Sequence, residues 1–124
     1  MAKFAKPVLR RLKKHYPWLT KLSEASGDLK EVKKILKKAT VGQILALAEI
    51  ILNILRRNVP LTVTEKRILC PFRNRLREIA SKKNNCERKR KIFINQKGGI
   101  LGIIGTILGA AIPAIKGLIS AFTG

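Results

Sequence analysis

The sequence predicts an all-α fold: a small helical bundle with a basic linker and a C-terminal glycine-rich apolar helix or tail. Two observations lead to this prediction. Apolar residues recur at three- and four-residue spacing through most of residues 1–97, the period of amphipathic helices, and no stretch there reads as a strand. Three residues that favour helix N-termini, Asp28, Thr40 and Thr62, each stand three positions before Glu or Gln.

The chain has room for one small domain and carries an extreme charge. Its 124 residues include 27 Lys and Arg against 7 Asp and Glu, a formal net charge of +20. Such a charge attracts a polyanion, either nucleic acid or an anionic membrane. Because 46% of the residues are hydrophobic, the chain is also too apolar for a disordered basic tail. We expect charged and apolar residues on separate faces, and folding that depends on a bound polyanion.

Residues that carry catalytic or metal chemistry are scarce, so we expect no enzyme, no cofactor and no metal site. His15 is the only imidazole, Cys70 and Cys86 are the only thiols, and their spacing is not that of a zinc site. No glycine-rich phosphate-binding motif occurs. The thiols are interpreted as reduced, because residues 1–22 lack the apolar stretch of a secretory signal; an oxidising compartment would allow them to form a disulfide.

Residues 1–27 are predicted to form a basic N-terminal arm. Pro7 suits the first turn of a short helix, which Pro17 then interrupts. A cluster of apolar residues around Trp18 would dock the arm on the rest of the protein. Its candidate nucleic-acid contacts are Arg10, Arg11, Lys13 and Lys14.

Residues 28–83 are predicted to form the helical bundle. Asp28 opens a helix with lysines opposite its apolar stripe, and Thr40 opens a helix over 41–57 that is apolar on most sides and should be central. A membrane span is the minor interpretation of 41–57, since that stretch is short and contains polar residues. Thr62 opens a third helix, in which Pro71 should cause a kink or restart. The candidate nucleic-acid contacts of that helix are Arg73, Arg75 and Arg77.

Residues 84–97 are predicted to form a basic linker. With the end of the preceding helix they supply the densest group of candidate phosphate contacts, which are Lys82, Lys83, Arg88, Lys89, Arg90 and Lys91. A solvated linker or a nuclear-localisation signal is the alternative interpretation, and it is compatible with nucleic-acid binding.

Residues 98–124 carry one charge and resemble a glycine zipper. We expect Gly102, Gly105 and Gly109 to share one helical face that allows close helix packing in lipid or in an oligomer. Gly98 pairs with Gly102 at GxxxG spacing, and Ala110 and Ala114 continue the small-residue spacing. The alternatives are a disordered tail and a helix folded back over the bundle. Pro113 and Lys116 shorten the apolar run, so an interfacial or re-entrant segment fits better than a single crossing.

The joint pattern of a basic stretch, a Gly-Gly-Ile-Leu start and an apolar tail resembles a known family. The segment QKGGILGIIGTILGAAIPAIKGLIS, residues 96–120, is similar to the C-terminal half of the adenovirus late core protein precursor that yields the mu peptide. Residues 68–99 resemble the corresponding small basic protein of adenovirus-like Polinton or adintovirus elements. The resemblance covers about half of the chain, and residues 1–67 take no part in it.

The resemblance implies a protein of the virion and host nucleus whose basic part condenses double-stranded DNA. It also implies a tail that is removed or acts on membranes. In that family the viral protease cuts after Gly-Gly preceded by an apolar residue, which would place cleavage between Gly99 and Ile100. Gln96 stands two residues before Gly98, where the family has Met, Ile or Leu, so the chain departs from the family's cleavage pattern.

The leading hypothesis is therefore a non-enzymatic DNA-binding protein that neutralises phosphates without reading sequence. Helix-turn-helix reading through Asn74 and Arg77 is a minor alternative. The alternative from another class is a membrane-active, lytic or pore-forming cationic protein that uses the glycine-rich tail. A third hypothesis has the tail dock on capsid protein or self-associate while the basic body faces the genome. DNA binding predicts that residues 1–97 suffice, whereas membrane activity requires residues 98–124.

Overall fold

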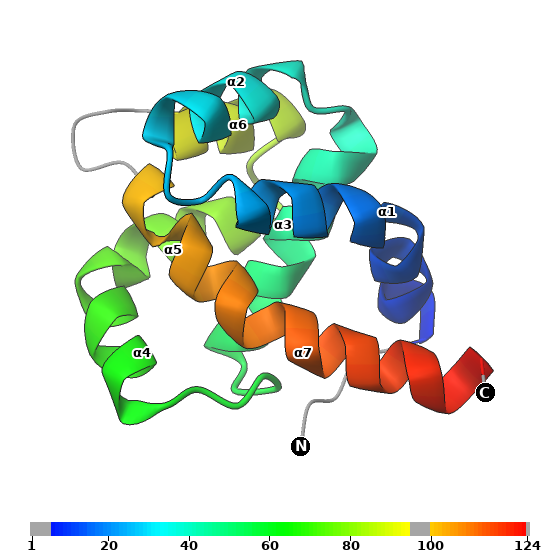
Figure 1. Cartoon of the computed structure of the whole chain (residues 1–124). Coiled ribbons are helices and arrows are strands. Elements are labelled where there is room, and N and C mark those ends of the chain that lie inside the picture. Colours follow the sequence, from blue (N-terminus) through cyan, green and yellow to red (C-terminus); the bar gives the residue numbers. More distant parts are fainter. Residues whose placement is uncertain (1–5, 95–99, 124) are drawn as a thin grey trace.

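The central element of the fold is an apolar helix that the other helices surround. The computed structural model describes residues 6–94 and 100–123, with side chains through 118. In it α3 (Val41–Leu55) contacts α1, α5, α6 and α7 (Figure 1). The surrounding elements are α1 (Lys6–Glu24), α2 (Leu29–Lys38), α4 (Val63–Leu69), the 3-10 turn η1 (Cys70–Phe72), α5 (Arg73–Ala80), α6 (Cys86–Ile94), the 3-10 turn η2 (Leu101–Ile103) and α7 (Ile104–Thr123). The described residues contain helices and no strands, which confirms the all-α bundle.

The predicted helix starts are confirmed by their capping bonds. The Asp28 carboxylate accepts hydrogen bonds from the backbone amides of Lys30 and Glu31 at the start of α2. Thr40 with Gln43, and Thr62 with Glu65, form reciprocal capping boxes at the starts of α3 and α4. Each cap satisfies amides that have no partner within the helix, so these polar residues fix where the helices begin.

The C-terminus of α3 is closed by a turn that holds a non-glycine residue in the left-handed region. The amide of Asn58 donates to the Asn53 carbonyl at 2.8 Å, and that of Arg57 donates to the Ile54 carbonyl at 3.1 Å. Arg57 has φ 61°, a conformation that glycine adopts at least cost. The buried Asn53 side chain accepts from Asn58 Nδ2 at 2.9 Å, which ties the turn to the helix.

Pro71 interrupts the helix in which it lies, whereas Pro17 does not. Pro71 falls in η1 and separates α4 from α5, as the predicted restart requires. Pro17 does not end α1, which continues to Glu24; this expectation was wrong. Leu12 and Leu19, which lie on opposite sides of Pro17 and seven residues apart, are both fully buried on one face. Packing at both positions holds the helix through the proline, so α1 is a core helix of the bundle rather than a separate arm.

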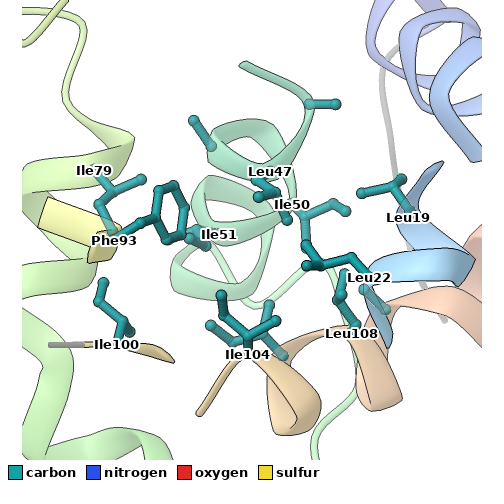
Figure 2. Close-up of a cluster of buried hydrophobic side chains, with 14 of the residues drawn as sticks. Leu19, Leu22, Leu47, Ile50, Ile51, Ile79, Phe93, Ile100, Ile104 and Leu108 are labelled. Carbon is teal, nitrogen blue, oxygen red and sulfur yellow. The ribbon is translucent and has the colours of Figure 1, made fainter. Parts of the chain in front are cut away.

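Residues 86–94 of the predicted basic linker form helix α6, which corrects the linker assignment for these residues. In α6, Ile92 is 3% exposed and Phe93 is fully buried. Figure 2 shows the Phe93 ring lying between Ile79 of α5 and Ile51 of α3. Truncation of a buried aromatic ring costs about 3–5 kcal/mol, so Phe93 attaches α6 firmly to the other helices. The segment is therefore part of the bundle.

The predicted tail also belongs to the core. Helix α7 packs against α1, and its fully or nearly buried side chains include Ile104, Ile107, Leu108 and Ala111. In Figure 2, Ile104 and Leu108 point toward Leu22 and Ile50. Of the alternatives open for this segment, the structure shows a helix folded onto the bundle. A fragment ending at residue 97 would therefore lack a large part of the core.

Candidate nucleic-acid interface

Most cations of the described residues lie on the surface without a carboxylate partner. Within residues 6–94 and 100–118, three ion pairs are formed: Arg11 with Glu49 at 3.6 Å, Arg75 with Glu78 at 3.9 Å, and Arg90 with Glu87 at 3.3 Å. Many other Lys and Arg side chains are exposed. Unpaired surface cations repel one another, so their effect on stability is unfavourable until an anion binds.

Two neighbouring helices, α2 and α6, both carry exposed cations. They lie side by side in Figure 1 and are in contact. Arg90 of α6 joins them, because its Nη1 donates to the carbonyls of Leu36 at 2.7 Å and Lys37 at 3.3 Å, at the C-terminus of α2. The exposed cations of this α2–α6 surface are Lys30, Lys34, Lys37, Lys38, Arg88 and Lys91.

Lys89 is not part of that surface. Only 5% of the residue is exposed, and its ammonium group donates to the carbonyls of Ile79 and Ser81 at the C-terminus of α5. Burial lowers the pKa of Lys89, while Cys86 and Glu49 act in the opposite direction. A cation at this place satisfies carbonyl groups that have no partner within the helix. The assignment of Lys89 as a phosphate contact is therefore corrected: it is a buried helix cap.

Three other predicted contacts have partners within the protein. Arg11 and Arg75 form the ion pairs given above, and Arg90 bonds to both α2 and Glu87. Because Arg90 is held by carbonyls and a carboxylate, it has few donors left for a phosphate. The sequence could not separate it from its neighbours, since the partners lie 53 and 54 residues away.

The remaining predicted contacts are exposed and fall into separate groups. Arg10, Lys13 and Lys14 lie on the outer side of α1, and Lys82 and Lys83 lie in the turn between α5 and α6. Arg73 and Arg77 line a hollow beside α4 instead. The α2 lysines were missing from the predicted site, although their spacing opposite an apolar stripe already indicated a solvent-exposed face.

His15 lies where α1 approaches the first turn of α3. A Cβ atom added at Gly42 would lie 2.9 Å from His15 Nε2, so glycine allows this close approach. Burial lowers the pKa of His15, and the charges of Lys14 and Arg11 lower it further. Burial and these two α1 cations thus both favour the neutral imidazole over the charged one.

The predicted glycine face of α7 is only partly a packing face. A Cβ atom added at Gly105 would lie 2.9 Å from Ser26 Oγ, which is a close contact with the turn after α1. Gly102 and Gly109 instead have no neighbour within 4 Å of that position, and Ala110 and Ala114 are half-buried. The bulky apolar residues make most of the contact with the bundle, with Gly105 and Ala110 beside them, while Gly102 and Gly109 stay open. The expectation that the small residues pack against another helix in lipid or in an oligomer stays a prediction.

The predicted cleavage position lies at the edge of the described chain. Gly98 and Gly99 fall outside the described residues, while Ile100 is fully buried in the core. A protease that binds Ile100 in its cleft would have to withdraw this side chain from the bundle.

The thiols and the acidic residues form no further centre in the described part of the chain. Cys70 is exposed, Cys86 is half-buried, and both are free. Among residues 6–94 and 100–123, no three His, Cys, Asp or Glu side chains gather as metal ligands. By length and composition, the window Leu101–Leu118 is apolar enough to cross a membrane, a test that buried core helices also pass.

Comparison with family models, with curated proteins and with solved structures found no match for this chain.

Proposed function

We propose that the protein is a non-enzymatic, sequence-independent DNA-binding virion core protein that acts by neutralising phosphates. The observation that carries the proposal is the excess of exposed cations on α1, α2 and α6, of which few in the described residues have a carboxylate partner. Each phosphate contact by Lys or Arg releases a counterion, so such surfaces bind any duplex with a strong dependence on salt.

The resemblance to adenovirus-like core proteins supports the same function. It implies double-stranded DNA as the partner and the virion and host nucleus as locations. The folded bundle adds a feature to that proposal, since the basic segment is presented on a rigid helix rather than on a flexible linker. The α2–α6 surface, with two helices side by side, is the proposed main contact.

The test is duplex binding by the full chain across a salt series, with two charge-matched variants. Lys34→Gln with Lys91→Gln removes two cations from the α2–α6 surface, and Lys21→Gln with Lys116→Gln removes two exposed cations elsewhere. We expect the first pair to reduce the salt slope by about two and to weaken binding to unrelated duplexes equally. The second pair should have the smaller effect. Weak binding with little salt dependence would contradict the DNA-binding proposal.

Membrane activity is the second candidate, and the apolar window in η2 and α7 is the observation that favours it. In that function α7 would leave the bundle and insert, with the cationic helices held on anionic lipid. Gly109→Leu tests it, because the position has open space and the substitution leaves the bundle intact. Unchanged leakage of anionic vesicles would contradict insertion through the glycine face, whereas a large loss of leakage with intact DNA binding would support it.

A further inference from the structure

A hollow of about 490 Å³ lies between the C-terminal end of α3 and helices α4 and α5. Among the described residues, its lining has two distinct chemistries and includes no carboxylate. Five of them are aliphatic: Ile54, Leu55, Leu61, Leu69 and Leu76. Four are cations: Arg57, Lys66, Arg73 and Arg77.

The four cations are exposed, and none of them forms an ion pair within the described residues. They come from three elements: the turn after α3, helix α4 and helix α5. Arg73 and Arg77 are one helical turn apart, so they are neighbours on one face of α5. The hollow thus combines an apolar floor with positive charge from several directions.

Arg57 adds a second observation. It is held at φ 61°, where glycine would be less strained and would close the helix equally well. A residue kept in an unfavourable conformation at a concave site is a reason to look for a role of its side chain. Here that side chain lines the hollow.

We propose that this hollow binds an acidic peptide segment of a partner protein, with one or two apolar side chains anchored on the aliphatic floor and carboxylates paired with the surrounding cations. Guanidinium groups favour carboxylates through paired hydrogen bonds. A single-headed amphiphile would engage only part of the cation set, and the phosphate backbone of a duplex has no apolar group for the floor. An acidic segment with apolar anchors matches both chemistries.

The probe is a fluorescein-labelled peptide of about twelve residues in which Glu and Asp flank one Phe and one Leu. A second peptide carries Ser in place of Phe and Leu at the same charge. The full-length protein should bind the first peptide at least about tenfold more tightly, because only that peptide has apolar side chains to bury on the aliphatic residues. Equal affinity for the two peptides would contradict an apolar floor.

Adjacent residues of α4 provide matched protein variants. Lys66 lines the hollow and Arg67 does not, while both are exposed. Lys66→Glu should weaken peptide binding at least about tenfold, and Arg67→Glu about twofold through the general loss of charge. Arg57→Gly should raise the melting temperature, because it relieves the backbone strain at this position. It should still weaken peptide binding, because it removes a cation from the hollow. Equal weakening by Lys66→Glu and Arg67→Glu would show binding to diffuse charge and overturn the proposal.

Cys70 locates the bound peptide, since this exposed free thiol also lines the hollow. At a peptide concentration about ten times Kd, its reaction with N-ethylmaleimide should slow about tenfold, because few sites remain empty. Cys86, which lies away from this hollow, should react at an unchanged rate and is the internal control. An unprotected Cys70 would overturn the proposal, as would equal protection by duplex DNA or by anionic phosphatidylserine vesicles.

The two proposals can fail independently. Lys66→Glu and Arg67→Glu should reduce duplex affinity by similar factors, because both remove surface charge. A failure of the acidic peptide to bind in the hollow would therefore leave the proposal of DNA binding by the α2–α6 surface unaffected.

Discussion

Helices α2 and α6 are both rich in cations and lie side by side, yet they use those cations differently. The lysines of α2 are mostly exposed, whereas α6 directs Lys89 and Arg90 onto the carbonyl ends of α5 and α2. One helix therefore presents its charge, and the other uses part of its charge to join the bundle. Charge density alone does not distinguish a surface that binds anions from a residue that supports the fold.

The largest expected effect concerns the aromatic anchor of α6. Phe93→Ala should lower the free energy of unfolding by about 3–5 kcal/mol, because a fully buried ring is removed from between α3 and α5. Chemical denaturation followed by circular dichroism would measure it. A loss below about 1 kcal/mol would mean that α6 is only loosely attached, as a linker would be.

The next largest effect is the difference in stability between variants of the buried Lys89 and of the exposed Lys91. Lys89→Ala should destabilise the protein by about 1–3 kcal/mol, because the carbonyls of Ile79 and Ser81 lose their buried donor. Lys91→Ala, on the exposed side of the same helix, should change stability by less than about 0.5 kcal/mol and should instead reduce duplex affinity. Equal stability losses would contradict the distinction between the two lysines.

The lowered pKa of Lys89 leads us to expect that the free energy of unfolding changes at alkaline pH. Because burial lowers its folded pKa below the usual value of 10.5, the folded protein loses the Lys89 proton before the unfolded chain does. Its contribution to stability should therefore rise as the pH passes through the folded pKa toward 10.5. The difference between the wild type and Lys89→Met, measured by denaturation at several alkaline pH values, should show that rise; a flat difference would contradict it.

The smallest effect concerns α1, where exposed cations face a titratable group. The pKa of His15 lies below 6.5, so the unfolded chain binds this proton before the folded protein does. Stability should be complete above pH 6.5 and should fall as the pH drops below it. His15→Gln should flatten this part of the stability profile, measured by melting temperature at several pH values. An unchanged profile would show that other groups cause the acid sensitivity.

The local signals in the sequence predicted much of the fold. Capping residues at 28, 40 and 62 and the restart at Pro71 could be recognised because their partners lie within a few residues. The continuation of α1 through Pro17 could not, because it depends on burial of Leu12 and Leu19 against distant helices. Whether a cation is exposed or bonded within the protein also depends on tertiary contacts, as the bonds of Lys89 and Arg90 show.

The site could be predicted only as a type of surface. The net charge indicated a polyanion, and Lys13, Lys14 and Lys91 were correctly chosen as solvent-facing, whereas Lys89 was not. The hollow beside α4 gave no sequence signal, because Arg57 and Lys66 reach it from separate elements. The role of α7 was open for a different reason: the same apolar residues fit a membrane, an oligomer or a core.

The central claim is that the closed bundle, with α7 in its core, is the form that binds DNA. Ser26→Cys with Gly105→Cys tests it in a chain whose own cysteines are replaced by Ser. The added Cβ at Gly105 would lie 3.1 Å from Ser26 Cβ, so a small adjustment allows a disulfide that locks α7 to the turn after α1. The account predicts the same duplex affinity and salt slope in the oxidised and reduced forms. Loss of binding on oxidation, restored by reduction, would show that α7 must leave the bundle and would contradict it.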